Sequence, residues 1–188
     1  CYPMAMDRKE RKDKIINLID GGVKIIAIDG RCASGKSTLS LDVKSERDIN
    51  IIKMDDFFLP LSLRTPERFA MPGGNVHWER FLDEVVAGLR SGKDFSYRRF
   101  SCSKMDYDGI AVVEASKPII IEGSYALHPS LPVYWERAFF LDVEKEEQLS
   151  RLERRSPEKL EDFKNKWIPL EEKYFSFCAI PSKADEIL

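Results

Sequence analysis

Cysteine and histidine are scarce in this chain of 188 residues, and their scarcity excludes several classes of protein. The four cysteines lie far apart, from Cys1 to Cys178, without a C-x-x-C pair, and only two histidines accompany them. Such spacing matches neither a structural zinc site nor the disulfide framework of a small secreted domain. We therefore expect reduced cysteines and a cytoplasmic location.

Long apolar runs and an excess of charge of one sign are also missing. No stretch approaches the roughly 20 apolar residues that cross a bilayer, and the charged start does not resemble a signal peptide. The 30 basic and 32 acidic residues give a net charge of −2, so no global field attracts nucleic acid or an anionic membrane. We expect a small-molecule partner, with neither nucleic acid nor a membrane, and the sequence leaves open whether copies form a homo-oligomer.

The length is typical of one domain with a substantial core, and we expect a single domain over residues 1–188. Because the chain begins at Cys1 rather than at a methionine, residues 1–6 are expected to be an added or flexible start.

Apolar runs alternate with segments of helical spacing along the chain. The runs predict strands at 23–28, 49–54, 119–122, 138–143 and 184–188. The periodic segments predict helices at 7–20, 36–44, 76–90 (with Asn75 as N-cap), 145–155 and 158–176. Nearly all-apolar strands separated by helices indicate a parallel sheet covered on both faces, which is a three-layer α/β fold.

Two segments depart from this alternation. Residues 60–75 contain three prolines and Gly73-Gly74, which predicts a long irregular loop, and such loops are commonly functional. Residues 95–100 and 110–114 predict a small hairpin around the loop 101–109. We expect both segments, 60–75 and 95–114, on the substrate side of the domain.

The strongest motif follows the first predicted strand. It has the G-x-x-x-x-G-K-[ST] spacing and consists of Gly30, Arg31, Cys32, Ala33, Ser34, Gly35, Lys36, Ser37 and Thr38. Glycines let successive backbone N–H groups converge on a phosphate, and the positive end of the following helix dipole faces the same anion. The Lys36 ammonium suits β- and γ-phosphates, and the Ser37 hydroxyl suits Mg²⁺. We expect all nine residues to bind ATP.

Acidic residues follow three of the predicted strands, where open α/β sheets bind their ligands. Asp55 and Glu122 are candidates for holding Mg²⁺ or for accepting a proton from an attacking hydroxyl, and the alternative is that they cap loops or helices. Asp29 directly precedes the first loop glycine and is expected to stabilise that turn. Cys32 lies in an electropositive loop that favours a thiolate, but the favoured interpretation is a small residue tolerated at a variable position.

Three arginines, Arg151, Arg154 and Arg155, share one face of a predicted helix. Directed at a triphosphate, they would neutralise the charge on the transferring phosphoryl group. The alternative is ordinary surface ion pairs, because Glu147 and Glu158 lie four residues from Arg151 and Arg154.

Taken together, these motifs resemble the uridine kinase / phosphoribulokinase-like P-loop kinases, especially short bacterial uridine kinase-like members. The resemblance is carried by the segments 30–38, 54–58 (MDDFF), 121–123 (IEG), 151–155 (RLERR) and 177–185. It implies a P-loop NTPase fold and the use of ATP and Mg²⁺. It also implies that Asp55 is the general base and a metal-site residue, that Glu122 and Ser37 belong to the metal site, and that Lys36, Arg151 and Arg154 are catalytic.

The same resemblance implies phosphoryl transfer to a hydroxyl of a small metabolite, foremost a nucleoside. Asp55, His77 and Phe100 are then the expected substrate-binding residues. His77 takes the place of an Asp in pyrimidine-specific members, Phe100 and about Met105 replace a Tyr and a His, and the segment 156–158 (SPE) replaces a further Arg-Gly-Arg. Pantothenate and ribosylnicotinamide are alternative acceptors, and a catalytically silent nucleotide-binding protein is an alternative of another class.

Overall fold

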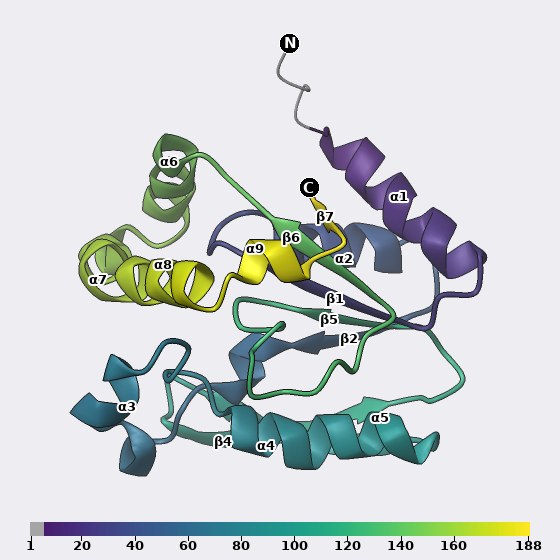
Figure 1. Cartoon of the computed structure of the whole chain (residues 1–188), viewed down its shortest axis with the longest axis horizontal. Coiled ribbons are helices and arrows are strands. Elements are labelled where there is room, and N and C mark those ends of the chain that lie inside the picture. The colour runs from purple at the N-terminus through teal and green to yellow at the C-terminus, as the bar shows by residue number, and fades with distance from the viewer. Residues whose placement is uncertain (1–5) are drawn as a thin grey trace.

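The computed structural model describes residues 6–188, and in this part of the chain a parallel sheet lies between two layers of helices (Figure 1). The helices are α1 Arg8–Asp20, α2 Lys36–Lys44, α3 Pro66–Ala70, α4 Trp78–Phe81, α5 Ala87–Ser91, α6 Lys145–Arg155, α7 Leu160–Asp162, α8 Ile168–Phe177 and α9 Ile180–Lys183. The strands are β1 Ile25–Gly30, β2 Asn50–Lys53, β3 Phe95–Ser101, β4 Asp106–Val113, β5 Ile119–Glu122, β6 Arg137–Leu141 and β7 Glu186–Ile187.

The central sheet has the strand order β2-β5-β1-β6-β7, and all of its pairs are parallel. Strand β1 therefore lies in the middle, with Ile28 opposite Glu122 of β5 and Gly30 opposite Leu141 of β6. Parallel pairing brings the carboxyl ends of the strands to one edge, where the predicted functional residues follow β1, β2 and β5. The predicted three-layer α/β fold is confirmed.

Alternate residues of β1 enter different cores, because successive side chains of a strand point to opposite faces. Ile26 and Ile28 pack with α1 and α2 in one buried cluster, whereas Ala27 belongs to a second cluster on the opposite face. The second cluster joins the sheet to α4, α5, α8 and the separate β3–β4 hairpin. The predicted hairpin is confirmed, with a shorter connection (102–105) than expected.

The segment 60–75 is more regular than the predicted loop. It contains a 3₁₀ turn, η2 Leu61–Leu63, and the short helix α3. Thr65 caps α3 by accepting a hydrogen bond from the backbone N–H of Arg68, and Pro66 occupies the first helical position, where a missing N–H costs nothing.

The predicted helix 76–90 begins later than expected, and its N-cap is not Asn75. His77 precedes the first helical residue, Trp78, and makes no side-chain capping bond. Asn75 is buried and donates instead to the hydroxyl of Tyr125, at 2.9 Å. The helix also widens into a π-helical segment, η3 Leu82–Val86, between α4 and α5.

The predicted helix 158–176 is likewise divided. It comprises a 3₁₀ turn η4 Pro157–Lys159, α7, a π-helical segment η5 Phe163–Trp167, and α8. The wide turn ends just before Pro169, which cannot donate a backbone hydrogen bond to the carbonyl of Asn165.

Most of the expected flexible start, residues 1–5, lies outside the described residues. Met6, the last residue of that start, packs against the core formed by α1 and α2. None of the helices within residues 6–188 combines the length and the apolar character that a membrane span needs.

Candidate active site

The phosphate loop joins the end of β1 to the start of α2 and depends on two glycines. Gly30 lies so close to the backbone of Leu141 on β6 that a Cβ atom would overlap it. Gly35 has a φ of 102°, a conformation that residues with side chains rarely adopt, immediately before Lys36 opens α2. These two glycines therefore allow the curled backbone of the loop, a conformation in which successive N–H groups can converge on an anion.

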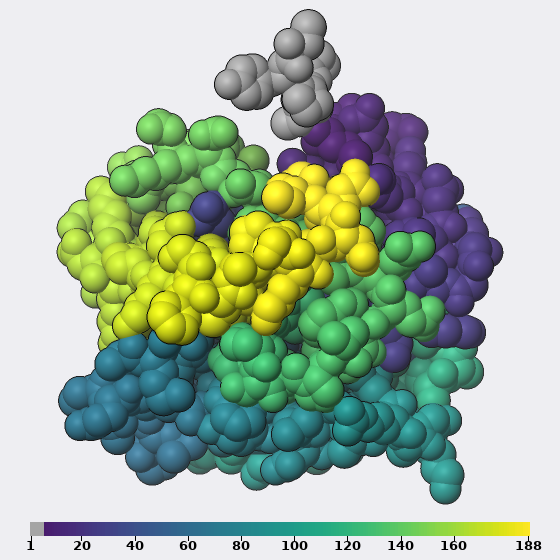
Figure 2. All heavy atoms as spheres, viewed as in Figure 1, coloured from purple at the N-terminus to yellow at the C-terminus, as the bar shows by residue number. Residues whose placement is uncertain are grey.

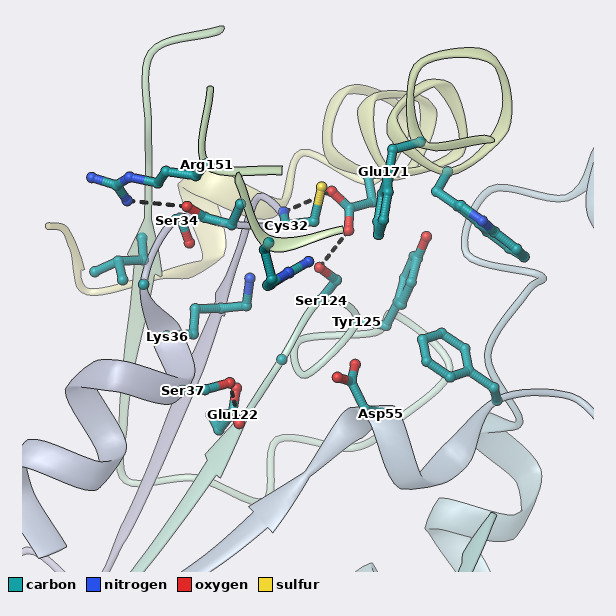
Figure 3. A pocket seen from close by; sticks show the side chains of 18 of the residues that line it. Cys32, Ser34, Lys36, Ser37, Asp55, Glu122, Ser124, Tyr125, Arg151 and Glu171 are labelled. Carbon is teal, nitrogen blue, oxygen red and sulfur yellow. Dashed lines mark hydrogen bonds between the residues drawn. The ribbon is translucent and has the colours of Figure 1, made fainter. Parts of the chain in front are cut away.

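Two cations are anchored on the carbonyl groups of this loop (Figure 3). The Lys36 ammonium donates to the carbonyls of Gly30 and Arg31, at 2.8 and 2.6 Å. The Arg151 guanidinium on α6 donates to the carbonyl of Ala33 at 3.0 Å. Both predicted cations thus contact the loop from separate elements, α2 and α6.

The loop opens into a cavity of about 900 Å³. Its lining includes Asp55, Phe58, Arg64, Phe69 and Asn75, and we call this group of residues the acceptor end. The lining also includes Arg11, Thr38, Leu39, Leu141 and Arg151, which we call the α1 end, and Figure 3 shows Asp55 and Arg151 on opposite sides of Lys36.

The acceptor end is closed from above by the C-terminal helices. Figure 2 shows the yellow-green segment of α7 and α8 resting on the blue segment that contains α3. Lys173 of α8 donates to the carbonyl of Ala70, and the Lys166 ammonium lies 5.0 Å from the ring centre of Phe69. That residues 60–75 lie on the substrate side stays a prediction.

Three oxygen-bearing side chains line the cavity near the loop. The Ser37 hydroxyl donates to Glu122 at 2.9 Å, and Asp55 lines the same cavity (Figure 3). Burial raises the pKa of Glu122, the negative charge of Asp55 raises it further, and the Ser37 hydrogen bond opposes both. Among residues 6–188 no cluster of three or more His, Cys, Asp or Glu side chains is arranged to hold a metal alone. One or two carboxylates with a hydroxyl nevertheless suit Mg²⁺, which usually completes its shell with water and substrate phosphates.

The two neighbouring aspartates after β2 have different surroundings. Asp55 faces the cavity, whereas the Asp56 carboxylate accepts a hydrogen bond from the Tyr97 hydroxyl at 3.1 Å, and its backbone carbonyl accepts one from Arg80. Burial raises the pKa of Asp56. Asp55 is therefore the member of the pair that can meet a ligand.

Asp29 stabilises the turn into the loop, as the sequence predicts. Its completely buried carboxylate accepts hydrogen bonds from the backbone N–H groups of Gly30, Tyr125 and Leu127 and from the Tyr174 hydroxyl. Burial raises the pKa of Asp29 to about 6, although these four bonds favour the ionised form.

Five predicted site residues lie outside the lining of the cavity: Gly30, Arg31, His77, Phe100 and Arg154. Arg154 is 70% exposed and turns toward Glu147, whereas Arg155 lines the cavity with its guanidinium near the ring of Phe163. His77 and Phe100 are also absent from the lining, which near the hairpin consists of Cys102 and Met105. Arg31 contributes only its backbone, because its guanidinium pairs with Asp142 and Glu172.

Cys32 has neither the exposure nor the charge state of a reactive thiolate. Burial, reinforced by the nearby Glu171 carboxylate, raises the pKa of its thiol to about 12. Cys32, Cys102 and Cys178 are all free thiols.

Glu171, which reaches the phosphate loop from α8, was not predicted from the sequence. Its carboxylate accepts hydrogen bonds from the backbone N–H of Cys32 at 2.9 Å and from the Ser124 hydroxyl at 2.6 Å (Figure 3). The sequence does contain an indication of this contact, because Glu171 shares a helix face with the buried Tyr174 and Phe175 at spacings of three and four. A charge within an apolar stripe indicates a buried partner, but the partner itself could not be read from the pattern.

Two comparisons with known proteins bear on this arrangement. No family model matches the sequence. A structure described as a possible uridine kinase from Bacillus stearothermophilus superposes with a TM-score of 0.71 at 17% identity, covering 96% of this chain and 98% of that one. A structure of a candidate fructose transport system kinase from Silicibacter sp. TM1040 gives a TM-score of 0.70 at 19% identity, covering 94% and 98%.

The chain has a P-loop kinase-like fold. Such low identity shows the fold alone, and agreement over nearly the whole length of both structures places α6–α9 within the P-loop kinase-like domain. What the domain does has to be argued from its own residues.

Proposed function

We propose that the protein is an ATP- and Mg²⁺-dependent kinase that transfers the γ-phosphoryl group of ATP to a hydroxyl of a small metabolite. The observation that carries this proposal is the position of Asp55, whose carboxylate shares one cavity with the phosphate loop. Phosphoryl transfer needs a cradle for the phosphates and a carboxylate that accepts the proton of the attacking hydroxyl. The kinase-like folds of the two superposed structures add support.

A residue of this chain can be assigned to each step of this reaction. The backbone of the loop and the Lys36 ammonium would bind the phosphates, and Arg151 and Arg155 would neutralise charge that develops on the transferring group. Ser37 and Glu122 would hold Mg²⁺ in the cavity that Asp55 also lines, and the ion would offset charge on the phosphate oxygens. Asp55 would take the proton of the acceptor hydroxyl.

A nucleoside is the acceptor that we propose first. The acceptor end carries the aromatic side chains of Phe58, Phe69 and Tyr125, which suit a flat base. The superposed Bacillus stearothermophilus protein is itself described as a possible uridine kinase.

Arg64 favours a second candidate, an acceptor with a negative charge such as pantothenate. Its guanidinium lines the acceptor end, donates to the carbonyl of Leu59 at 2.8 Å, and has no carboxylate partner among the described residues. A carboxylate on the acceptor would provide one.

The decisive experiment incubates the protein with ATP, Mg²⁺ and a panel of acceptors (uridine, cytidine, nicotinamide riboside, pantothenate and fructose) and detects phosphorylated products by mass spectrometry. Asp55→Asn should lower turnover at least about a hundredfold, the typical contribution of a general base, while ATP affinity is retained. Asp56→Asn is the matched control and should retain turnover within a few-fold, because Asn still accepts the Tyr97 hydrogen bond outside the cavity.

Full turnover in Asp55→Asn would remove Asp55 from the mechanism. Tight binding of ATP without turnover on any acceptor would instead favour a catalytically silent nucleotide-binding protein.

A further inference from the structure

Helix α1 precedes the phosphate-loop strand and lies beside α2 on the same face of the sheet (Figure 1). Two ion pairs, Arg8–Asp42 and Lys12–Glu46, join residues that are each 34 positions apart. Equal offsets mean that α1 runs in the same direction as the end of α2 and the residues that follow it. The first turn of α1 therefore lies next to the last turn of α2, the helix that begins at the phosphate loop.

Arg11, in the first turn of α1, lines the cavity. Arg11 shares the α1 end with Thr38 and Leu39 of α2 and with Arg151 of α6. Its Nε atom is buried and has no hydrogen-bond partner among residues 6–188. Leaving such a group unsatisfied is costly, and native proteins rarely do so without a ligand or water nearby.

The neighbouring cations of α1 contrast with Arg11, because each has an acidic partner. Arg8 pairs with Asp42, Lys9 with Asp13 and Lys12 with Glu46. Arg11 instead has another cation, Arg151, in the same lining, and burial together with the positive charge of Arg151 lowers the pKa of Arg11. Two guanidinium groups that share a cavity wall repel each other until an anion lies between them.

The orientation of a bound nucleotide follows from the two ends of the cavity. Figure 3 shows Asp55 and Arg151 on opposite sides of Lys36 and the loop. The phosphoryl group to be transferred has to face Asp55, so the remainder of the triphosphate extends toward the α1 end. We propose that Arg11 is a nucleotide-binding residue that contacts the triphosphate on the side away from Asp55. This inference rests on the proposed function, because it uses Asp55 to orient the nucleotide.

The experiment measures binding of Mg²⁺–ATP and of Mg²⁺–tripolyphosphate by titration calorimetry. Arg11→Gln should weaken both ligands about tenfold or more, the effect of losing one charge-assisted hydrogen bond. Arg11→Lys keeps the charge and should stay within a few-fold of wild type. Lys9→Gln is the matched control on the same helix and should bind both ligands as wild type does, since its ammonium pairs with Asp13 in solvent.

A second variant, Arg11→Met, keeps the apolar stem and covers the case in which Arg11→Gln fails to fold, with thermal melting as the check. Unchanged affinity in the charge-removing variants, or a loss for ATP without a loss for tripolyphosphate, would overturn the inference. If wild type binds both ligands through Arg11 but phosphorylates no acceptor, the inference stands and the kinase proposal fails. If wild type binds neither ligand, both fail.

Discussion

Asp29 shows how one residue can support the loop without touching a ligand. Four donors converge on its carboxylate, and residues 6–188 supply no basic partner within hydrogen-bond distance. The hydrogen bonds hold the turn before the phosphate loop against the segment after β5. The position of the phosphate loop therefore depends on a residue that is completely buried beneath it.

The raised pKa of Asp29 makes stability depend on pH. Its pKa is about 6 in the folded state against an ordinary value of 3.8, so the folded state binds more protons between these values. The stability that neutral Asp29 contributes is fully present below about pH 4 and is lost as the pH rises through about 6. From pH 4 to pH 7 we expect this group to cost about 3 kcal/mol of unfolding free energy.

Asp29→Asn, which stays neutral at every pH, tests this expectation. Urea unfolding of wild type and variant over this range should show the difference in unfolding free energy moving in favour of the variant as the pH rises. Parallel pH profiles for the two proteins would contradict it.

At the residue scale, the side chains that could be predicted from the sequence are those placed by the end of a strand or by a motif. Asp55, Glu122, Lys36 and Ser37 each follow a strand or belong to a motif with fixed spacing, and they meet in one cavity. Glu171 could not be placed, because its contact with the loop depends on how α8 packs over a distant part of the chain. His77 and Phe100 were predicted from alignment to a family pattern, and the geometry of the cavity puts other side chains in its lining.

At the scale of elements, helix α5 and strand β3 approach each other unusually closely. A Cβ atom built on Gly88 would lie well inside van der Waals contact with the ring of Phe95. Glycine in the middle of a helix is otherwise unfavourable, by roughly 1 kcal/mol relative to alanine. Its presence here is explained by the aromatic ring that packs directly on the helix backbone.

Gly88→Ala should therefore destabilise the protein despite the better helix propensity of alanine. Overpacking against Phe95 costs typically 1–3 kcal/mol and outweighs the gain of about 1 kcal/mol. Thermal unfolding of the single variant should show a lower midpoint than wild type. In a Phe95→Ala background the same substitution should become neutral or stabilising, and a stabilised single variant would show that the ring moves aside freely.

The ends of a helix were predictable where its capping residues lie next to it in the sequence. Helix α1 begins after Asp7, which forms a reciprocal capping box with Glu10, and the pattern located this helix to within one residue. The two π-helical segments could not be predicted from periodicity, because they widen the helical turn without changing which residues form the apolar stripe. The prediction of Asn75 as an N-cap was wrong, because its side chain bonds to the distant Tyr125, a tertiary contact that the local sequence does not show.

At the scale of the whole molecule, the cavity is assembled from segments that are distant in sequence. Its lining comes from α1, the phosphate loop, the ends of β2 and β5, the segment 58–75, the hairpin connection, and α6 to α8. The fold class was predictable because apolar strands alternate with helices. The strand order and the closure by α7 and α8 were not, since neither leaves a local pattern in the sequence.

A ligand that contacts so many separate segments should stabilise the whole fold rather than one element. At an ATP concentration a hundred times its dissociation constant, with Mg²⁺ present, binding to the folded state alone adds about 2.7 kcal/mol. For a chain of this size we expect the melting midpoint to rise by roughly 5–10 °C. Lys36→Ala should largely abolish the rise, because the ammonium that would neutralise the phosphates is gone. Lys44→Ala, at the other end of α2 where the ammonium meets the carbonyl of Ile49, should keep it. An equal rise in Lys36→Ala and wild type would show that ATP binds away from the phosphate loop.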